Sequence, residues 1–178
     1  MKITILREAG YEEAMLGLSL SFNADPSRMP ARAEKLAKMD PASGEVKFLE
    51  AIAVWLDITA PRYWWSQMDT YRCGVSKQSE STMHTLMKGL VGKPDFEGED
   101  LPQTTINNLN AWIKIGDFEM AKKMLPESFL QRRIVATNYK TLLHIIRQRH
   151  DHKLFEWRAF CHAMRGLKHR HYIFGGDR

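Results

Sequence analysis

The sequence predicts an α+β protein in which a modest, mainly antiparallel sheet packs against several helices. Val54, Leu56 and Ile58 alternate with less apolar residues in AVWLDIT, a pattern typical of a half-buried strand. The opening KITIL, residues 2–6, predicts another strand, and helical periodicity fills most of the rest. Because 178 residues suffice for one domain with a real core, we expect residues 1–178 to form a single domain.

The composition is that of an ordinary soluble globular protein. It is 44% hydrophobic and 26% charged, and it contains no apolar run of about eighteen residues that would span a membrane. Arg7 and Glu8 interrupt the first apolar run, which argues against a signal peptide. With only Cys73 and Cys161, the chain offers no disulfide framework, so we expect a cytoplasmic protein.

The formal charge of +5 favours anionic partners without naming them. Nucleic acid, nucleotide phosphates and polyglutamylated folate all fit, and a solvated helix face is the alternative for any single basic residue. Much of the excess follows Gln131, in Arg132, Arg133, Lys140, Arg147, Arg149, Lys153, Arg158, Arg165, Lys168, Arg170 and Arg178.

The first sixty residues alternate between short regular elements and turns. A helical pattern begins after Gly10, a short helix is expected over residues 31–39, and the Pro and Gly of DPASGE mark a turn. VKFLEAI predicts the start of another helix. The strand over residues 53–59 follows it directly.

Pro61 is expected to open a helix over residues 62–72, since proline is well suited to the first helical turn. Its adjacent aromatic residues, Tyr63, Trp64 and Trp65, predict either core or a subunit interface. The alternative is a platform on which a base or flavin ring stacks. A helix over residues 62–72 could also contribute to an oligomer contact.

The middle of the chain contains a polar stretch, an acidic loop and two helices. Residues 69–84 are a reasonable place for ligand contacts, and part of 73–83 is expected to join the sheet. Residues 90–104 read as a solvated acidic loop. Thr104 or Thr105 is expected to cap the helix TINNLNAWIKIG, and Asp117 the short helix that carries Lys122.

Residues 121–149 predict a break at Leu125-Pro126 followed by one long helix that runs to Arg149. Its apolar stripe consists of Leu130, Ile134, Leu142, Ile145 and Ile146. Asn138 and Arg149 would then be about three helical turns apart and project on nearly the same side. We therefore expect Lys122, Asn138 and Arg149 to converge on one pocket that holds an anion.

The C-terminal part predicts a final amphipathic helix, HDHKLFEWRAFCHAMRGL, and a tail, RGLKHRHYIFGGDR, that forms a surface segment or an oligomer contact. His150 and His152, like His169 and His171, resemble metal ligands in their spacing. A zinc site requires three or four ligands in register, so we expect no metal.

Three motifs carry a resemblance to a known family. AKKMLP, ATNYKTLLHIIRQR and EWR are similar to A-R-x-x-L-P, N-x-R-x-L-x-x-F-x-x-x-R and Q-x-E-I-R of the flavin-dependent thymidylate synthases, also called thymidylate synthase complementing proteins. The resemblance implies that Lys122 contacts the nucleotide, that Asn138 and His144 contact the flavin, and that Arg149 grips the deoxyuridylate. His152 lies one residue from a histidine position that touches the flavin.

A second resemblance lies upstream, where the family has glutamine followed by R-H-R-x-x-S-x-N-E-x-S-x-R-Y. Gln67 and Ser81 match nucleotide-binding positions, and Arg72 matches the last arginine of R-H-R, which binds the cofactor. Thr70-Tyr71 replace the first Arg-His, and Met83 replaces the arginine after the serine. These departures predict altered or lost flavin binding.

The resemblance implies transfer of a one-carbon unit to C5 of a pyrimidine deoxynucleotide similar to dUMP, with Arg149 as the catalytic residue. It implies FAD as cofactor, NADPH and methylenetetrahydrofolate as co-substrates, and a homotetramer with shared active sites. Cys73 is an alternative nucleophile, although a structural cysteine beside Gly74 is the simpler interpretation. Other hypotheses are a nucleotide-binding relative without catalysis and a nucleic-acid-binding protein that uses residues 131–153.

Overall fold

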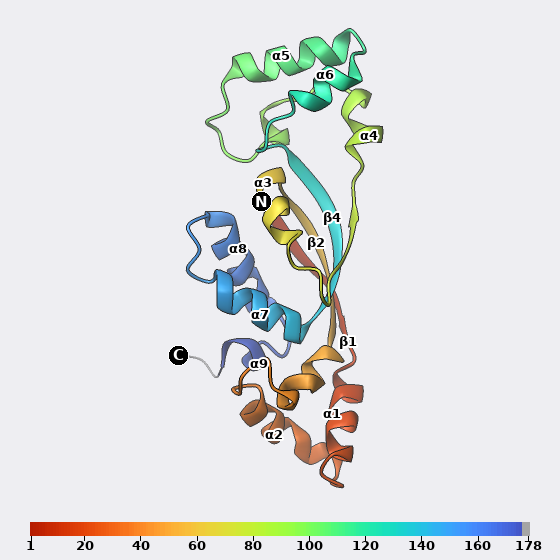
Figure 1. The fold of residues 1–178 in the computed structure, drawn as a ribbon, viewed down its shortest axis with the longest axis vertical. Helices are drawn as coiled ribbons and strands as arrows, with labels where there is room; N and C mark the ends of the chain where they lie inside the picture. The colour runs from red at the N-terminus through yellow and green to blue at the C-terminus, as the bar shows by residue number, and fades with distance from the viewer. Residues whose placement is uncertain (176–178) are drawn as a thin grey trace. The chain divides into compact units, whose positions relative to one another are not determined.

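The computed structural model describes residues 1–175, and Arg178, one of the basic residues named above, lies outside the described residues. Four strands form one antiparallel sheet in the order β1-β2-β4-β3 (Figure 1). They are β1 (Lys2–Ala9), β2 (Ala53–Pro61), β3 (Ser76–Ser79) and β4 (Leu130–Asn138). The predicted α+β class is confirmed.

Helices account for most of the remaining regular structure. The α-helices are α1 (Tyr11–Leu20), α2 (Met29–Leu36), α3 (Arg62–Met68), α4 (Thr82–Thr85), α5 (Gln103–Lys114), α6 (Phe118–Lys123), α7 (Tyr139–Arg149), α8 (Phe155–Ala163) and α9 (His171–Phe174). The 3-10 helices are η1 (Pro26–Arg28), η2 (Gly44–Glu50), η3 (Leu86–Lys88), η4 (Lys93–Asp95) and η5 (Met164–Gly166). None of the helices in the described chain is long and apolar enough to cross a membrane.

The described chain divides into two compact units. Unit 1 consists of residues 1–2, 58–70 and 78–133, and unit 2 contains 3–57, 71–77 and the remainder from Ile134. The division falls within strands, after Asp57 in β2 and after Arg133 in β4. That residues 1–178 form a single domain stays a prediction.

The core of unit 1 lies around α5 and α6, which pack side by side (Figure 1). Its buried residues are Leu86, Phe96, Ile106, Leu109, Ile113, Ala121 and Leu125. On α3, Trp64 and Trp65 are fully buried, with their rings edge to face and 4.8 Å between centroids. Trp65 Nε1 donates to the carbonyl of Gln131 at 2.8 Å. For these two tryptophans the core interpretation is confirmed.

In unit 2, α7 packs against η2, α8 and α9. The fully buried aromatic side chains Tyr139, Trp157 and Phe160 anchor this packing. Tyr139 donates its hydroxyl hydrogen to Glu8 and accepts from the His169 backbone N–H at 3.1 Å. Burial, followed by the Glu8 hydrogen bond, raises the pKa of the Tyr139 phenol, so the phenol stays a neutral donor.

The largest correction concerns the long helix expected after Pro126. Residues Leu130–Asn138 form strand β4 instead, and α7 begins only at Tyr139. Leu130 and Ile134 match a helical spacing, but Val135 and Thr137 are the buried residues, two apart, as a strand requires. β-branched residues fit a pleated sheet better than a helix, and here this preference decides.

Smaller corrections concern element ends. The helix expected from VKFLEAI is a 3-10 helix over residues 44–50, and α5 starts after Pro102 with no side-chain cap from Thr104 or Thr105. The final helix is shorter than expected, since α8 covers only Phe155–Ala163. The tail was wrongly predicted to be a surface segment, because its Leu167, Tyr172 and Ile173 are buried within the chain.

Asn138 is where β4 passes into α7. Its Oδ1 accepts from the Thr141 backbone N–H at 2.9 Å, which caps the helix. We predict that Asn138→Ala lowers the free energy of unfolding by about 1 kcal/mol, the usual contribution of an N-cap acceptor. Urea denaturation measures it. Asn138→Asp keeps the acceptor and should retain most of the stability, and equal losses in both variants would contradict the capping role.

Candidate functional site

The predicted site residues fall in both compact units. Unit 1 contains Gln67, Ser81 and Lys122, whereas unit 2 contains Arg72, Asn138, His144, Arg149 and His152. The expected convergence of Lys122 with the residues of unit 2 therefore stays a prediction. Within each unit, however, the geometry around these residues is defined.

In unit 2 the most organised group surrounds Arg149, the last residue of α7. We call Tyr71, His144, Gln148, Arg149 and Trp157 the arginine cluster. The guanidinium carbon of half-buried Arg149 lies 4.7 Å from the ring centroid of Trp157, which is fully buried. Its Nε donates to the Tyr71 hydroxyl oxygen at 2.8 Å. The stacking on Trp157 and the hydrogen bond of Nε to Tyr71 together hold the guanidinium plane of Arg149 in one orientation.

A chain of hydrogen bonds continues from Arg149 along α7. The Tyr71 hydroxyl donates to Gln148 Oε1 at 2.9 Å, and Gln148 Nε2 lies 3.1 Å from His144 Nε2. Because an amide nitrogen only donates, His144 Nε2 is the acceptor in this contact. Tyr71 is only 9% exposed, so its hydroxyl is committed to the chain. The exposed side chain of His144 thus lies at one end of this series of hydrogen bonds, and Arg149 lies at the other end.

His152 flanks the arginine cluster. Its ring centroid lies 6.2 Å from that of Trp157, and its Nδ1 accepts from the Leu154 backbone N–H at 3.1 Å. Burial lowers the pKa of His152, and the positive charges of Arg149, Arg158 and Lys153 lower it further. Because Nδ1 accepts this hydrogen bond, the neutral imidazole carries its proton on Nε2, which can donate a hydrogen bond to a ligand.

Asn138 does not share a helical face with Arg149, contrary to the prediction. It is extended and lies before the first turn of α7, whereas Arg149 lies in the last turn, roughly 16 Å further along the axis. Asn138 instead lies against the loop at Gly74, where a Cβ would meet Asn138 Nδ2 at 3.0 Å and Thr141 Oγ1 at 2.3 Å. The positive φ of 69° and this approach both require glycine. Arg72, in the same loop, is exposed.

In unit 1, Lys122 donates a hydrogen bond to the hydroxyl of Thr82, a buried residue. Burial lowers the pKa of Lys122, and the positive charge of Arg62 lowers it further. Arg62 donates to the Leu125 carbonyl at 2.8 Å and lies 3.1 Å from a Glu127 carboxylate oxygen. The positive charge that lowers the lysine pKa also favours a nearby anion, and the Glu127 carboxylate offsets part of that charge.

The other two candidates of unit 1 lie near these cations in sequence. Ser81 immediately precedes Thr82 and is the N-cap residue of α4. Gln67 lies on α3, the helix that starts at Arg62, and is half-buried. The structure brings Lys122 next to Thr82, the neighbour of Ser81.

Sequence reasoning gave no site role to five residues of these clusters: Tyr71, Gln148, Trp157, Arg62 and Thr82. Tyr71 was noted only as a departure from R-H-R, and Trp157 as part of the EWR match and of the apolar side of the final helix. A tyrosine in an otherwise polar stretch was the available signal for Tyr71. Thr82 carried no signal, since its burial arises from the packing of α4.

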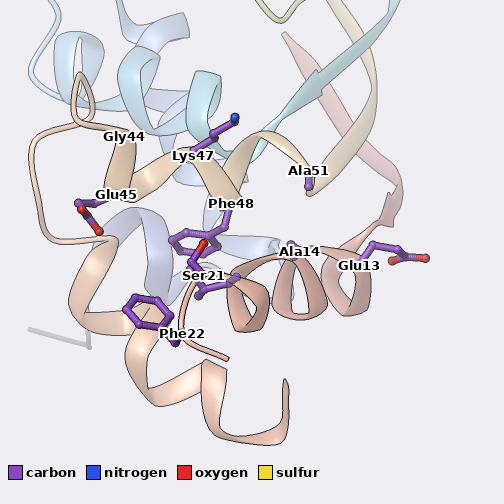
Figure 2. A pocket seen from close by; sticks show the side chains of 11 residues that line it. Glu13, Ala14, Ser21, Phe22, Gly44, Glu45, Lys47, Phe48 and Ala51 are labelled. Atoms are coloured by element: carbon purple, nitrogen blue, oxygen red, sulfur yellow. The ribbon is translucent and has the colours of Figure 1, made fainter. Parts of the chain in front are cut away.

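Within residues 1–175, no group of three or more His, Cys, Asp or Glu side chains is placed to hold a metal ion. A pocket of about 610 Å³ between α1 and η2 contains none of the predicted site residues. Figure 2 shows Glu13 and Glu45 on opposite sides of this pocket, with Ser21 and Phe48 between them.

In this α+β protein an arginine lies against an indole face and a lysine lies beside a second cation, and such side chains suit small anions. Residues 14–171 match the family described as thymidylate synthase complementing protein, and the chain belongs to this family. No curated protein matches the chain.

The fold is also similar to solved structures. One is a flavin-dependent thymidylate synthase, ThyX, from Helicobacter pylori complexed with FAD and dUMP, with a TM-score of 0.80 and 16% identity over 98% of both chains. Another structure of thymidylate synthase X from Helicobacter pylori, with FAD and dUMP, has the same TM-score and identity and covers 98% of this chain and 97% of the other. At such identity the likeness concerns the fold.

The Tyr71–Arg149 hydrogen bond is open to a double-mutant cycle. We predict a coupling of about 1 kcal/mol between Tyr71→Phe and Arg149→Gln, because a charged donor makes the stronger kind of hydrogen bond. Urea denaturation of both single variants and the double variant measures it. Tyr71→Phe with Arg28→Gln, on the exposed η1, is the control pair and should be additive. Additivity of the first pair would contradict the arrangement.

Proposed function

We propose that this protein is an enzyme of the flavin-dependent thymidylate synthase type that transfers a one-carbon unit to C5 of dUMP or a similar pyrimidine deoxynucleotide. Membership of the thymidylate synthase complementing protein family over residues 14–171 supports the reaction class. The solved relatives of the same fold hold FAD and dUMP.

The observation that carries the proposal is the orientation of Arg149. This residue stands at the position of the family pattern that grips the deoxyuridylate, and Tyr71 and Trp157 fix its guanidinium plane. A planar guanidinium donates two parallel hydrogen bonds to a phosphate or to a uracil carbonyl. An oriented donor also stabilises negative charge that develops on the carbonyl during C5 chemistry, at no cost of reorganisation.

Lys122, Ser81 and Gln67, all in unit 1, are further candidates for nucleotide contacts on the strength of the family pattern. Lys122 replaces an arginine and supplies a single point charge, which suits a phosphate oxygen but gives no bidentate contact. Its position beside Thr82 and Arg62 supports an anion-binding role. Ser81 and Gln67 add a hydroxyl and an amide, which suit ribose and base edges.

The remaining donors fit FAD. Arg72 is an exposed cation suited to the diphosphate, while Asn138, through its amide nitrogen, and His144 offer polar contacts to the ring system or ribityl chain. Tyr71 does not take over the role of the family histidine, because its hydroxyl is buried against Arg149 and Gln148. The proposed cofactor site therefore has fewer contacts than the family pattern, and we expect weaker retention of FAD.

When bound and reduced, FAD supplies hydride for the transfer reaction. The residues of the chain are proposed to bind and orient the nucleotide, with Arg149 of unit 2 as the oriented donor and Lys122 and Gln67 as separate contacts from unit 1. His152, whose pKa is lowered and whose Nδ1 accepts from Leu154, is suited to donate a hydrogen bond from Nε2 to a ligand near Arg149. No protein nucleophile is required by this scheme.

The proposal extends to partners and assembly. NADPH and methylenetetrahydrofolate are the proposed co-substrates, and a cytoplasmic homotetramer with shared active sites is the proposed assembly. Trp64 and Trp65 do not support a contact between chains, since both are buried in unit 1.

Flavin binding and turnover test the proposal directly. We predict that the purified protein is yellow, or becomes so with added FAD, and that it releases tritium from C5-labelled dUMP when reductant and methylenetetrahydrofolate are present. Absorbance near the flavin bands and scintillation counting measure the two results. Stabilisation by dUMP without tritium release would instead identify a nucleotide-binding relative without catalysis.

Arg149→Ala is predicted to weaken dUMP binding by about 1.5–3 kcal/mol, the size of a charge-assisted hydrogen bond. Arg149→Lys should recover only part of the loss, because an ammonium lacks the planar fork. Calorimetric titration measures both, and Arg28→Ala in the same unit is the matched control. If Arg149→Ala binds dUMP as tightly as the parent protein, Arg149 does not hold the nucleotide.

A further inference from the structure

Unit 2 contains a second pocket, of about 470 Å³, that the proposed reaction does not use. It is lined by Ile146, Arg147, His150, Asp151, Arg158, Cys161, His162, Arg165, Ile173 and Phe174. These residues come from the C-terminal part of α7, the segment that follows it, α8, η5 and α9. None of them is a predicted site residue, and we call this set the basic pocket.

The charge of the basic pocket is strongly one-sided. Arg147, Arg158 and Arg165 contribute three permanent positive charges, and Asp151 is the single carboxylate in the lining. That carboxylate lies 2.9 Å from His150 Nε2, so its charge is directed at a neighbouring imidazole. The lining therefore retains a positive excess that suits an anion.

Two of the arginines are held in place by the fold. The guanidinium carbon of Arg165 lies 4.7 Å from the centroid of the Phe174 ring, and Arg158 donates to the His152 carbonyl at 3.0 Å. Holding these side chains before a ligand arrives reduces the ordering entropy that binding would otherwise cost. The floor consists of the buried apolar residues Ile146, Cys161 and Ile173.

The C-termini of α7 and α8 lie in this region, and the negative end of a helix dipole opposes an anion. At α7 the opposing carbonyls are partly covered, since His150 Nδ1 lies 3.3 Å from the Ile146 oxygen and 3.2 Å from the Arg147 oxygen. Each helix end carries roughly half a charge, which is smaller than the excess from three arginines. Arginine rather than lysine at all three positions favours phosphate, which accepts paired hydrogen bonds from the guanidinium fork.

We propose that the basic pocket is a second anion site that takes a short polyphosphate chain, separate from the nucleotide site. Its volume falls within the usual range for small-molecule sites. The chain could come from inorganic tripolyphosphate or from a nucleoside triphosphate. In the second case the Phe174 ring and the apolar floor would receive the base.

Calorimetric titration of the full-length protein with inorganic tripolyphosphate tests the site. We expect saturable binding with about one equivalent per chain and about tenfold weaker affinity in Arg147→Gln and in Arg165→Gln, because each removes a charge-assisted contact. Arg28→Gln, an exposed arginine of unit 2 outside the pocket, should bind as the parent does. Absence of saturable binding, or an equal loss in Arg28→Gln, would overturn the proposal.

Further ligands identify the source and separate this site from the nucleotide site. Tighter binding of dTTP than of tripolyphosphate would support a nucleoside triphosphate, and equal affinities would support the phosphate chain alone. Tighter binding of citrate or of a single-stranded oligonucleotide would overturn the proposal of a small polyphosphate ligand.

Two variants test whether the two sites are independent. Arg149→Ala should leave tripolyphosphate affinity unchanged, and Arg165→Gln should leave dUMP affinity unchanged. Failure of dUMP to bind would therefore reject the proposed function without touching the basic pocket.

Discussion

The passage from β4 to α7 at Asn138 sets the position of every functional side chain that α7 carries. Three hydrogen bonds fix it: Asn138 Oδ1 accepts from the Thr141 N–H, the Tyr139 N–H donates to the Ile52 carbonyl at 3.0 Å, and the Tyr139 hydroxyl donates to Glu8. Because a helix rotates by 100° per residue, a cap that fixes the first residue fixes the direction of the last. The buried residues Leu142, Ile145 and Ile146 keep the helix in the same rotation about its axis.

Once the rotation of α7 about its axis is set, residues that alternate in its sequence face two different groups of side chains. His144, Gln148 and Arg149 belong to the arginine cluster, while Arg147 and the adjacent His150 line the basic pocket. Residues two apart on a helix do not face each other, so Arg147 and Arg149 serve different surroundings. The basic residues of this segment are thus divided between the arginine cluster and the basic pocket. A count of basic residues cannot show this division.

The sequence was sufficient for the fold class, for the alternating strand β2 and for the family, but not for the path of the chain through β4. Two apolar residues, Leu130 and Ile134, satisfied a helical spacing, and the sheet neighbours that override that spacing are not local in sequence. Asn138 and Arg149 were candidates on the strength of the motif and their roles stay predictions, whereas their predicted relation in space was wrong because it depended on the helix. The burial of Thr82 beside Lys122 required the three-dimensional packing of unit 1.

Tyr71 stands where the family pattern has histidine, and the structure gives a physical reason for this departure. A histidine at this position would be shorter than tyrosine, whereas the tyrosine hydroxyl reaches both Gln148 and the Nε of Arg149. The substitution exchanges a polar contact implied for the cofactor for a fixed orientation of the arginine over Trp157. If Arg149 holds the nucleotide as proposed, the residues around it preorganise the nucleotide contact rather than a flavin contact. Under the proposed function, this arrangement favours an ordered contact to the substrate over tight retention of the cofactor.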